Sequence, residues 1–321
     1  MRETITELIW VRLPGPLRHR ARLIASLLVL AGSLFFLGYA VVQGWDTLEP
    51  HVRDIDYRFL GLAFLCYPFG FLPIAWNWHK IMTGVAGFDN RGQNIRVYCL
   101  SCLPKRIPGF IWYVASRIAL YRERRVDAPA VVAATGVETI ILILSGGLTY
   151  LVTIGATHLR LERSLAGPAV VVFLLAIVAP ILAPILCHGA VRLLRHVGVS
   201  VSVDFGARDV MLLLGTSVLA WIGGGGILFL VANSVTAVSL MDLPRVIGAW
   251  GAAGAFGLVA GLLVQGMGLR EVTLAMLLSG LMPFSVAALV SILFRLLLTV
   301  GEVVWALAIA WYAGRFASGL P

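Results

Sequence analysis

The stretch "LPKRIPGFIW", residues 103–112, places two cations and a broken backbone inside an apolar part of the chain. Lys105 and Arg106 follow Pro104 and precede the Pro108-Gly109 pair. Proline removes a backbone donor and ends or kinks a helix, so the chain is expected to bend here. Basic residues flank the apolar segment on both sides, which places both flanks in the cytoplasm. We therefore expect residues 92–121 to form a re-entrant helical hairpin.

The rest of the chain has the composition of a membrane protein. Of its 321 residues, 60% are hydrophobic and 13% are charged, and the mean hydropathy is +0.92. Soluble domains carry about a quarter charged residues, whereas the repeated apolar runs here have the length of about 20 residues that a spanning helix needs. The sequence thus predicts an all-α polytopic integral membrane protein, with one membrane domain over residues 1–321 and no appended catalytic domain.

Hydropathy and the distribution of Lys and Arg predict the topology. The basic segment 1–22 is expected to stay in the cytoplasm before a first span, since the apolar run after it is too long for a cleaved signal peptide. The segment 245–282 is interrupted like the first hairpin and forms either a second hairpin or two short spans. The positive-inside rule then puts both termini on the cytoplasmic side of the cell's inner membrane. About six full spans are expected, at residues 23–42, 59–82, 129–154, 168–187, 210–231 and 284–311.

The order span, broken segment, span occurs twice. Residues 59–154 are expected to enter from outside, and residues 210–311 run in the opposite direction. Inverted repeats with interrupted helices are a recurrent transporter design, whose substrate site lies between the two broken segments. The pattern rests on hydropathy, since the two halves share no similarity at the level of single letters.

Several ionisable residues fall inside the apolar stretches. Each charge costs about 2.5–3.5 kcal/mol at the centre of a spanning helix on insertion scales, so these groups are expected to pair or to face a wet cavity. Charge pairing that only holds helices together is one interpretation. A second interpretation is a site for an anionic ligand. It is favoured because the eight residues comprise five cations and three carboxylates, which leaves an excess of two positive charges. The residues are Lys105, Arg106, Arg117, Glu138, Arg270, Glu271, Arg295 and Glu302.

The backbone at the two breaks favours the same ligand. Pro108-Gly109 precedes an expected helix over 110–120, and Gly266-Met-Gly268 precedes another over 269–281. Helix N-termini expose unpaired N–H groups and bind phosphate, and arginine forks fit phosphate oxygens. Trp112 is a candidate contact for a lipid headgroup, although an interfacial position explains it as well. With the eight charged residues, these five positions form the predicted substrate site.

The chain shows no motif of an enzyme. It has no HExxH, no nucleophile elbow and no nucleotide-binding loop, and Cys99-Leu-Ser-Cys102 has no second pair of ligands nearby, so we expect no metal, no cofactor and no catalysis. The pI of about 9.9 does not indicate nucleic acid, because the arginines flank spans instead of forming an aromatic basic patch. Anionic lipid is the expected partner. The run Gly223 to Gly226 is expected to allow close helix packing or a local break in the helix.

Two motifs in order resemble the lysylphosphatidylglycerol synthase transmembrane region, or flippase-like domain, family. They are "KRIPGFIWYVASRIALYRERRV" at 105–126 and "GMGLREVTLAMLLSG" at 266–280, and the Arg of "LFRLLLTVGEVVW" also fits. The family often has Tyr at the position of Arg106, and a Pro-x-Pro-Gly-Gly turn where this chain has "LLVQGMG". The resemblance implies a lipid-translocating membrane domain and a homodimer. It does not imply the synthase activity, since no aminoacyl-transferase domain is expected in this chain.

Three functions follow as hypotheses. The first is a flippase that moves a phosphate-bearing lipid or lipid-linked intermediate between leaflets. The second is a membrane transferase acting on lipid phosphates, with Glu138 or Glu271 as base. The third is a scaffold or accessory subunit for a partner lipid-modifying enzyme.

Overall fold

The computed structural model describes residues 31–104 without 33 and 34, 110–161, 206–264 and 268–317, together with positions 185 and 189. Apart from short connecting segments, these residues are helical, and the described ranges contain no strand. Five helices are long and apolar enough to cross a membrane. The prediction of an all-α, multi-pass membrane protein is therefore confirmed.

The first predicted unit, 59–154, is a series of four helices, and a short helix α3 (Trp45–Arg53) precedes it. Asp56 caps the first of the four by accepting a hydrogen bond from the backbone N–H of Arg58 at 2.9 Å. Gly87 ends the same helix in the left-handed conformation, with φ 62°. Two short helices occupy the segment 92–121 in which a hairpin was expected, and each is too short to cross a bilayer alone. The four are α4 (Tyr57–Ala86), α5 (Arg91–Cys102), α6 (Phe110–Arg122) and α7 (Ala128–Leu161).

The second predicted unit, 210–311, also has four helices, with one difference. Its broken segment is unequal, because the first arm has 22 residues and is long and apolar enough to cross the membrane. Only the second arm, of 10 residues, is short. The members are α9 (Ala207–Val235), α10 (Leu243–Val264), α11 (Leu269–Leu278) and α12 (Phe284–Ala317), with a 3-10 turn η2 (Leu240–Asp242) before α10.

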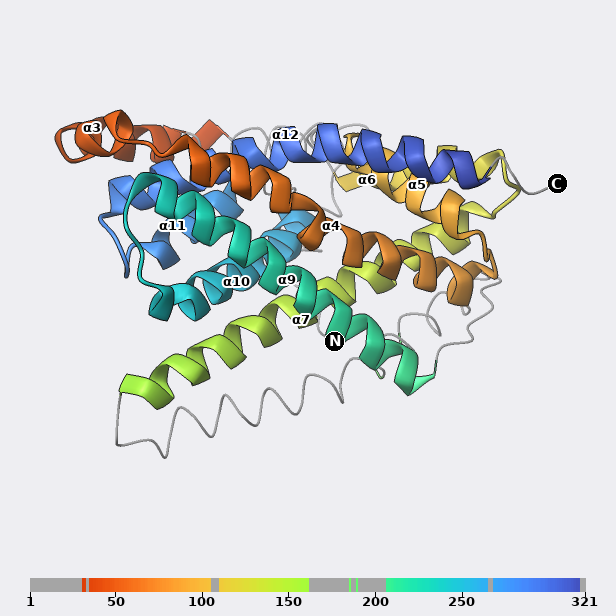
Figure 1. Ribbon diagram of the computed structural model, residues 1–321. Helices are drawn as coiled ribbons and strands as arrows, with labels where there is room; N and C mark the ends of the chain where they lie inside the picture. The colour runs from red at the N-terminus through yellow and green to blue at the C-terminus, as the bar shows by residue number, and fades with distance from the viewer. Residues whose placement is uncertain are drawn as a thin grey trace, which may run out of the picture.

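The packing of these eight helices has a two-fold pattern. Exchanging α4 with α9, α5 with α10, α6 with α11 and α7 with α12 maps each substantial helix contact onto another. The contact of α4 with α9 maps onto itself, and the contact of α5 with α12 maps onto that of α10 with α7. Figure 1 shows α12 crossing the molecule from the side of α11 to the side of α5 and α6. The order predicted from hydropathy therefore corresponds to two units of equivalent packing.

The two units run in opposite directions. The backbone N–H of Asp56, before α4, donates to Ser234 O near the end of α9 at 2.9 Å. Asn77, late in α4, donates to the hydroxyl of Ser217 in the first half of α9, also at 2.9 Å. Since early residues of one helix meet late residues of the other, α4 and α9 are antiparallel, as an inverted repeat requires.

Glycines allow the closest helix crossings. Gly70 of α4 faces Gly223 and Gly224 of α9, where an added Cβ would lie 3.3 Å from the facing backbone. Gly146 of α7 and Gly251 of α10 meet in the same way, with 2.8 Å from an added Cβ to the facing carbonyl oxygen. Association inside a bilayer relies on such close contact, because lipid tails are as apolar as the side chains. The glycine run of α9 thus has the packing role expected from the sequence.

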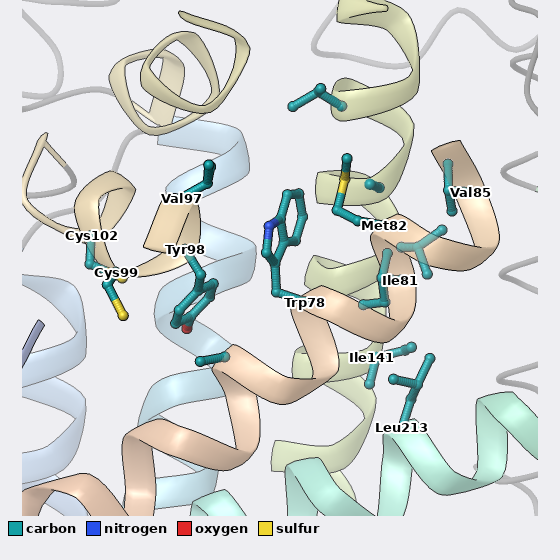
Figure 2. Packing of buried hydrophobic residues seen from close by; sticks show 14 of the residues in the cluster. Trp78, Ile81, Met82, Val85, Val97, Tyr98, Cys99, Cys102, Ile141 and Leu213 are labelled. Atoms are coloured by element: carbon teal, nitrogen blue, oxygen red, sulfur yellow. The ribbon is translucent and has the colours of Figure 1, made fainter. Parts of the chain in front are cut away.

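Two buried clusters form the interior. One gathers around Trp78, where α4, α5, α6 and α7 meet, and Figure 2 shows this ring between Tyr98 of α5 and Met82 of α4. The other surrounds Trp250 and Phe294 and joins α9, α10, α11 and α12. Both clusters also take residues from the other unit, since the first includes Leu213 of α9 and Ala306 of α12 and the second includes Ala63 of α4. The long helices therefore contribute to both cores.

Some predicted features lie outside the described residues. These are the basic segment 1–22, half of the first span and, apart from position 185, the span at 168–187. The same holds for the turn between α5 and α6 with Lys105, Arg106, Pro108 and Gly109, and for Gly266. Of the six predicted spans, the structure describes four, as α4, α7, α9 and α12.

Candidate functional site

A buried ion pair joins α6 to α7. Arg117 and Glu138 have side chains 0% and 4% exposed, and Arg117 Nη1 lies 2.5 Å from Glu138 Oε2. A second bond, from Nη2 to Oε1, measures 3.2 Å, so the contact is bidentate. This geometry is the strong form of an arginine–carboxylate pair. We call these two residues the Arg117 clamp.

The surroundings of Arg117 engage the rest of its guanidinium. Its Nε donates to Ser101 Oγ at 3.2 Å, Nη1 also donates to Thr135 Oγ1 at 3.3 Å, and Nη2 donates to the hydroxyl of Tyr113. The ring of Trp78 lies 3.6 Å from Cζ, and that of Tyr113 lies 4.0 Å away. Guanidinium carries five N–H donors, and five bonds are made here. A ligand phosphate would therefore have to displace Glu138 to reach Arg117.

A hydrogen-bonded chain holds Trp78 against this arginine. The indole Nε1 donates to Tyr121 OH at 2.9 Å, and this hydroxyl donates to Asn94 Oδ1 at 2.6 Å. Asn94 is fully buried and donates in turn to Phe88 O at 2.9 Å. Buried polar groups need such partners. The chain ties the Arg117 clamp to the turn between α4 and α5.

A second group of charges lies around α11. Arg295 of α12 and Glu271 of α11 are 2.5 Å apart, with side chains 29% and 12% exposed. We call them the Glu271 clamp. Glu271 Oε2 is buried and has no hydrogen-bond partner among the described residues. This clamp is thus more open than the first and is bonded through one carboxylate oxygen.

Arg270 lies beside this clamp and stacks on an aromatic ring. Its Cζ is 3.9 Å from the centre of the Trp250 ring, a cation–π contact. Trp250 is held by Phe294, at 4.7 Å between ring centres, and by Trp221. Gly257 of α10 leaves the space for the arginine, because a Cβ there would lie 2.9 Å from that of Arg270. The cation is therefore positioned by α10 and half-buried.

The two clamps occupy equivalent places in the two units, but the helices that supply the cation and the carboxylate are exchanged. Each joins the short second arm of a broken segment to the long helix that follows, α6 to α7 and α11 to α12. In the first unit the short helix supplies the cation, and in the second it supplies the carboxylate. In Figure 1, α6 and α11 lie over opposite halves of the bundle. The sequence argument placed all of these charges around one groove, and the structure distributes them over two clusters.

The remaining predicted site residues have separate positions. Trp112 is on α6 with half of its surface exposed. Gly268 precedes α11 with φ 97°, a conformation that favours glycine, so this helix begins where the sequence predicted. Glu302 is half-buried on α12. Arg295 pairs with Glu271.

The charge balance inside the bundle changes the argument for an anion. The described interior holds three of the predicted cations and three carboxylates, and Arg117 pairs with Glu138 while Arg295 pairs with Glu271. The surplus of two positive charges consists of Lys105 and Arg106, which lie outside the described residues. In the described ranges no group of three His, Cys, Asp or Glu could hold a metal ion.

Sequence reasoning missed the residues that position the charges. Trp78, Tyr113, Ser101 and Thr135 all contact Arg117, and Trp250 contacts Arg270. Tyr113 stands one helical turn before Arg117, a spacing that puts both on one face. The other partners come from different helices, and no spacing in the sequence indicates them.

No protein-family model and no curated protein matches the chain, so the resemblance to the flippase-like family rests on its motifs. The fold and the charges define an all-α, multi-pass membrane protein with two inversely oriented packing units, each containing an ion pair between its short helix and the long helix that follows.

Proposed function

We propose that this protein moves an anionic, phosphate-bearing lipid or lipid-linked intermediate between the leaflets of the cell's inner membrane. The observation that carries the proposal is the position of Arg270 and Arg295, two partly buried cations beside the break between α10 and α11. Buried cations in a membrane mark substrate pathways. Inverted-repeat transporters bind their substrates at such breaks.

The chemistry of the cluster fits a phosphate headgroup. Arginine binds phosphate oxygens through paired N–H donors, and Arg295 keeps 29% of its side chain exposed. Glu271 holds Arg295 when the headgroup is absent, and a phosphate replaces this carboxylate with little change in local charge. The acyl chains remain in the surrounding lipid. Four residues at the break between α5 and α6, together with Gly266 at the break between α10 and α11, remain predicted contacts; the four are Lys105, Arg106, Pro108 and Gly109.

The charges at the two ends of the bundle support an orientation. Basic residues gather where α4 ends, α5 begins and α6 ends, while acidic residues predominate near α3 and η2, at the other end. By the positive-inside rule, the basic end faces the cytoplasm, which places the C-terminal end of α12 there as well. The basic residues are Lys80, Arg91, Arg96, Arg122, Arg124, Arg125 and Arg208.

The test is lipid movement in reconstituted vesicles. Fluorescent headgroup-labelled phosphatidylglycerol is incorporated, and the fraction protected from an external quencher is followed in time. Arg270→Ala and Arg295→Gln should each slow exchange at least tenfold. Arg245→Ala, which removes an exposed cation paired with Asp242, is the matched control. Unchanged exchange in both folded variants would refute the proposal.

The alternative functions predict different results. In the transferase hypothesis Glu138 or Glu271 acts as base, yet both carboxylates are engaged by arginines. A covalent product after incubation with donor and lipid would favour this hypothesis. The scaffold hypothesis predicts co-purification of a lipid-modifying enzyme and tolerance to loss of the buried arginines. Native mass spectrometry of gently purified protein tests the expected homodimer and identifies bound lipid in one measurement.

A further inference from the structure

We infer that the Arg117 clamp and the Glu271 clamp are equivalent gates that open alternately, one toward each side of the membrane. The inference rests on the proposed function for what passes between the gates. The coupling between them rests on the packing alone.

The first argument is equivalence. Glu138 and Arg295 stand at nearly the same distance from the N-termini of α7 and α12, the helices that correspond in the two units. Each pairs with the short helix that precedes its own long helix. Because the units run in opposite directions, equivalent positions lie at opposite depths in the membrane. In Figure 1, α6 with its clamp and α11 with its clamp lie at opposite sides of the bundle.

The second argument is that the clamps differ in state. The Arg117 clamp is bidentate, and both of its side chains are almost fully buried. The Glu271 clamp is partly exposed, and one carboxylate oxygen has no hydrogen-bond partner in the described part of the chain. In this structure, the Arg117 clamp is therefore closed and the equivalent Glu271 clamp is partly open. In a protein with inverted units, exchange of the two conformations gives a state that opens to the other side.

The third argument is a mechanical link. Helix α12 carries Arg295 and packs against α11 of its own unit and against α5 of the other. Helix α7 carries Glu138 and packs against α6 and α10. Separation of α12 from α11 must therefore shift the packing on α5, which supplies Ser101 to the Arg117 clamp. Since packed interfaces change between discrete arrangements, the two clamps share one equilibrium.

The test measures thiol accessibility at both gates. Cys99 on α5 is 0% exposed and lies two residues from Ser101, so it reports on the Arg117 clamp. Ala275 on α11 is also 0% exposed, and Ala275→Cys in a background without other cysteines reports on the Glu271 clamp. The rate of modification by a small methanethiosulfonate reagent is measured for each reporter alone, in wild type, Glu138→Gln and Glu271→Gln.

Reciprocal changes are the expected result. Glu138→Gln should speed labelling of Cys99 and slow labelling of the Ala275→Cys reporter, and Glu271→Gln should do the reverse, each by about fivefold or more. Purely local loosening would raise labelling only beside the substitution, and that outcome would overturn the inference. If Glu138→Gln does not fold, Arg117→Lys weakens the same clamp while keeping its charge.

A matched control and a second assay complete the design. Glu49→Gln removes the exposed pair with Arg53 on α3 and should leave both labelling rates unchanged. Lipid exchange is measured in the same proteins. Reciprocal labelling without lipid movement would refute the proposed cargo and keep the gates. Lipid movement without reciprocal labelling would refute the gates and keep the cargo.

Discussion

Replacing Arg117 by leucine tests whether the buried ion pair carries the stability of the first unit. The substitution removes the guanidinium but keeps an apolar side chain between Trp78 and Tyr113. Glu138 then stays 3% exposed with its arginine partner gone. Removing one partner of a buried pair destabilises by about 3–5 kcal/mol, mainly because the other charge is left uncompensated.

The structure also predicts the pattern among related variants. Arg117→Leu combined with Glu138→Leu leaves no buried charge, so it should recover much of the loss seen in the single variant. Arg295→Leu should cost less, about 1–2 kcal/mol, because that side chain is 29% exposed and water compensates Glu271 in part.

Thermal unfolding of detergent-purified protein, followed by tryptophan fluorescence, measures these differences. At about 2 °C of midpoint shift for each kcal/mol in a chain of this size, Arg117→Leu should lower the midpoint by about 6–10 °C. The double variant should lie closer to wild type. A single variant as stable as wild type, or a double variant less stable than the single, would show that the buried pair does not act as described.

Three further substitutions test the packing, each with a matched glycine as control. Gly146→Ala should destabilise the protein by about 1–3 kcal/mol, because the added Cβ would lie 2.8 Å from Gly251 O. A Cβ at Gly147 would meet nothing within 4 Å, so Gly147→Ala should be neutral in the same thermal assay. Gly257→Ala should push Arg270 away from the face of the Trp250 ring and slow lipid exchange severalfold. Gly261→Ala, at an open position, should leave lipid exchange unchanged. Equal exchange rates in the two variants would argue against a role for Arg270 in lipid movement. Gly268→Ala should lower stability by about 1–2 kcal/mol, since φ 97° is strained for alanine, and the thermal midpoint of Gly280→Ala, where no positive φ occurs, gives the comparison.

Much of the fold could be predicted from the chain alone. The long helices α4, α7, α9 and α12 are apolar runs of spanning length, and a local property of the sequence is enough to find them. The break before α11 was also readable, because Gly268 permits a backbone conformation that other residues avoid. The sequence did not predict that α10, the first arm of the second broken segment, would be long enough to span the membrane. The hydropathy of residues 240–261 suits a hairpin arm and a full span equally.

The sequence indicated which charged residues lie within apolar segments, but it did not indicate which of them pair. The sequence indicated that Arg117, Glu138, Arg270, Glu271 and Arg295 need partners, because an isolated charge in lipid is costly. The choice of partner depends on which helices are neighbours. Glu271 meets Arg295 only because α11 folds back against α12.

The sequence by itself determined that this is an all-helical membrane protein, that its order of spans and breaks occurs twice, and that charges lie within its apolar segments. Those properties follow from hydrophobicity and backbone chemistry, which act residue by residue along the chain. Only the tertiary structure decided that the charges form two clamps of opposite polarity in opposite halves of the bundle, one closed around Arg117 and one partly open at Glu271. Ion pairing depends on distances of a few ångströms between side chains on different helices, and the packing of α6 against α7 and of α11 against α12 sets those distances.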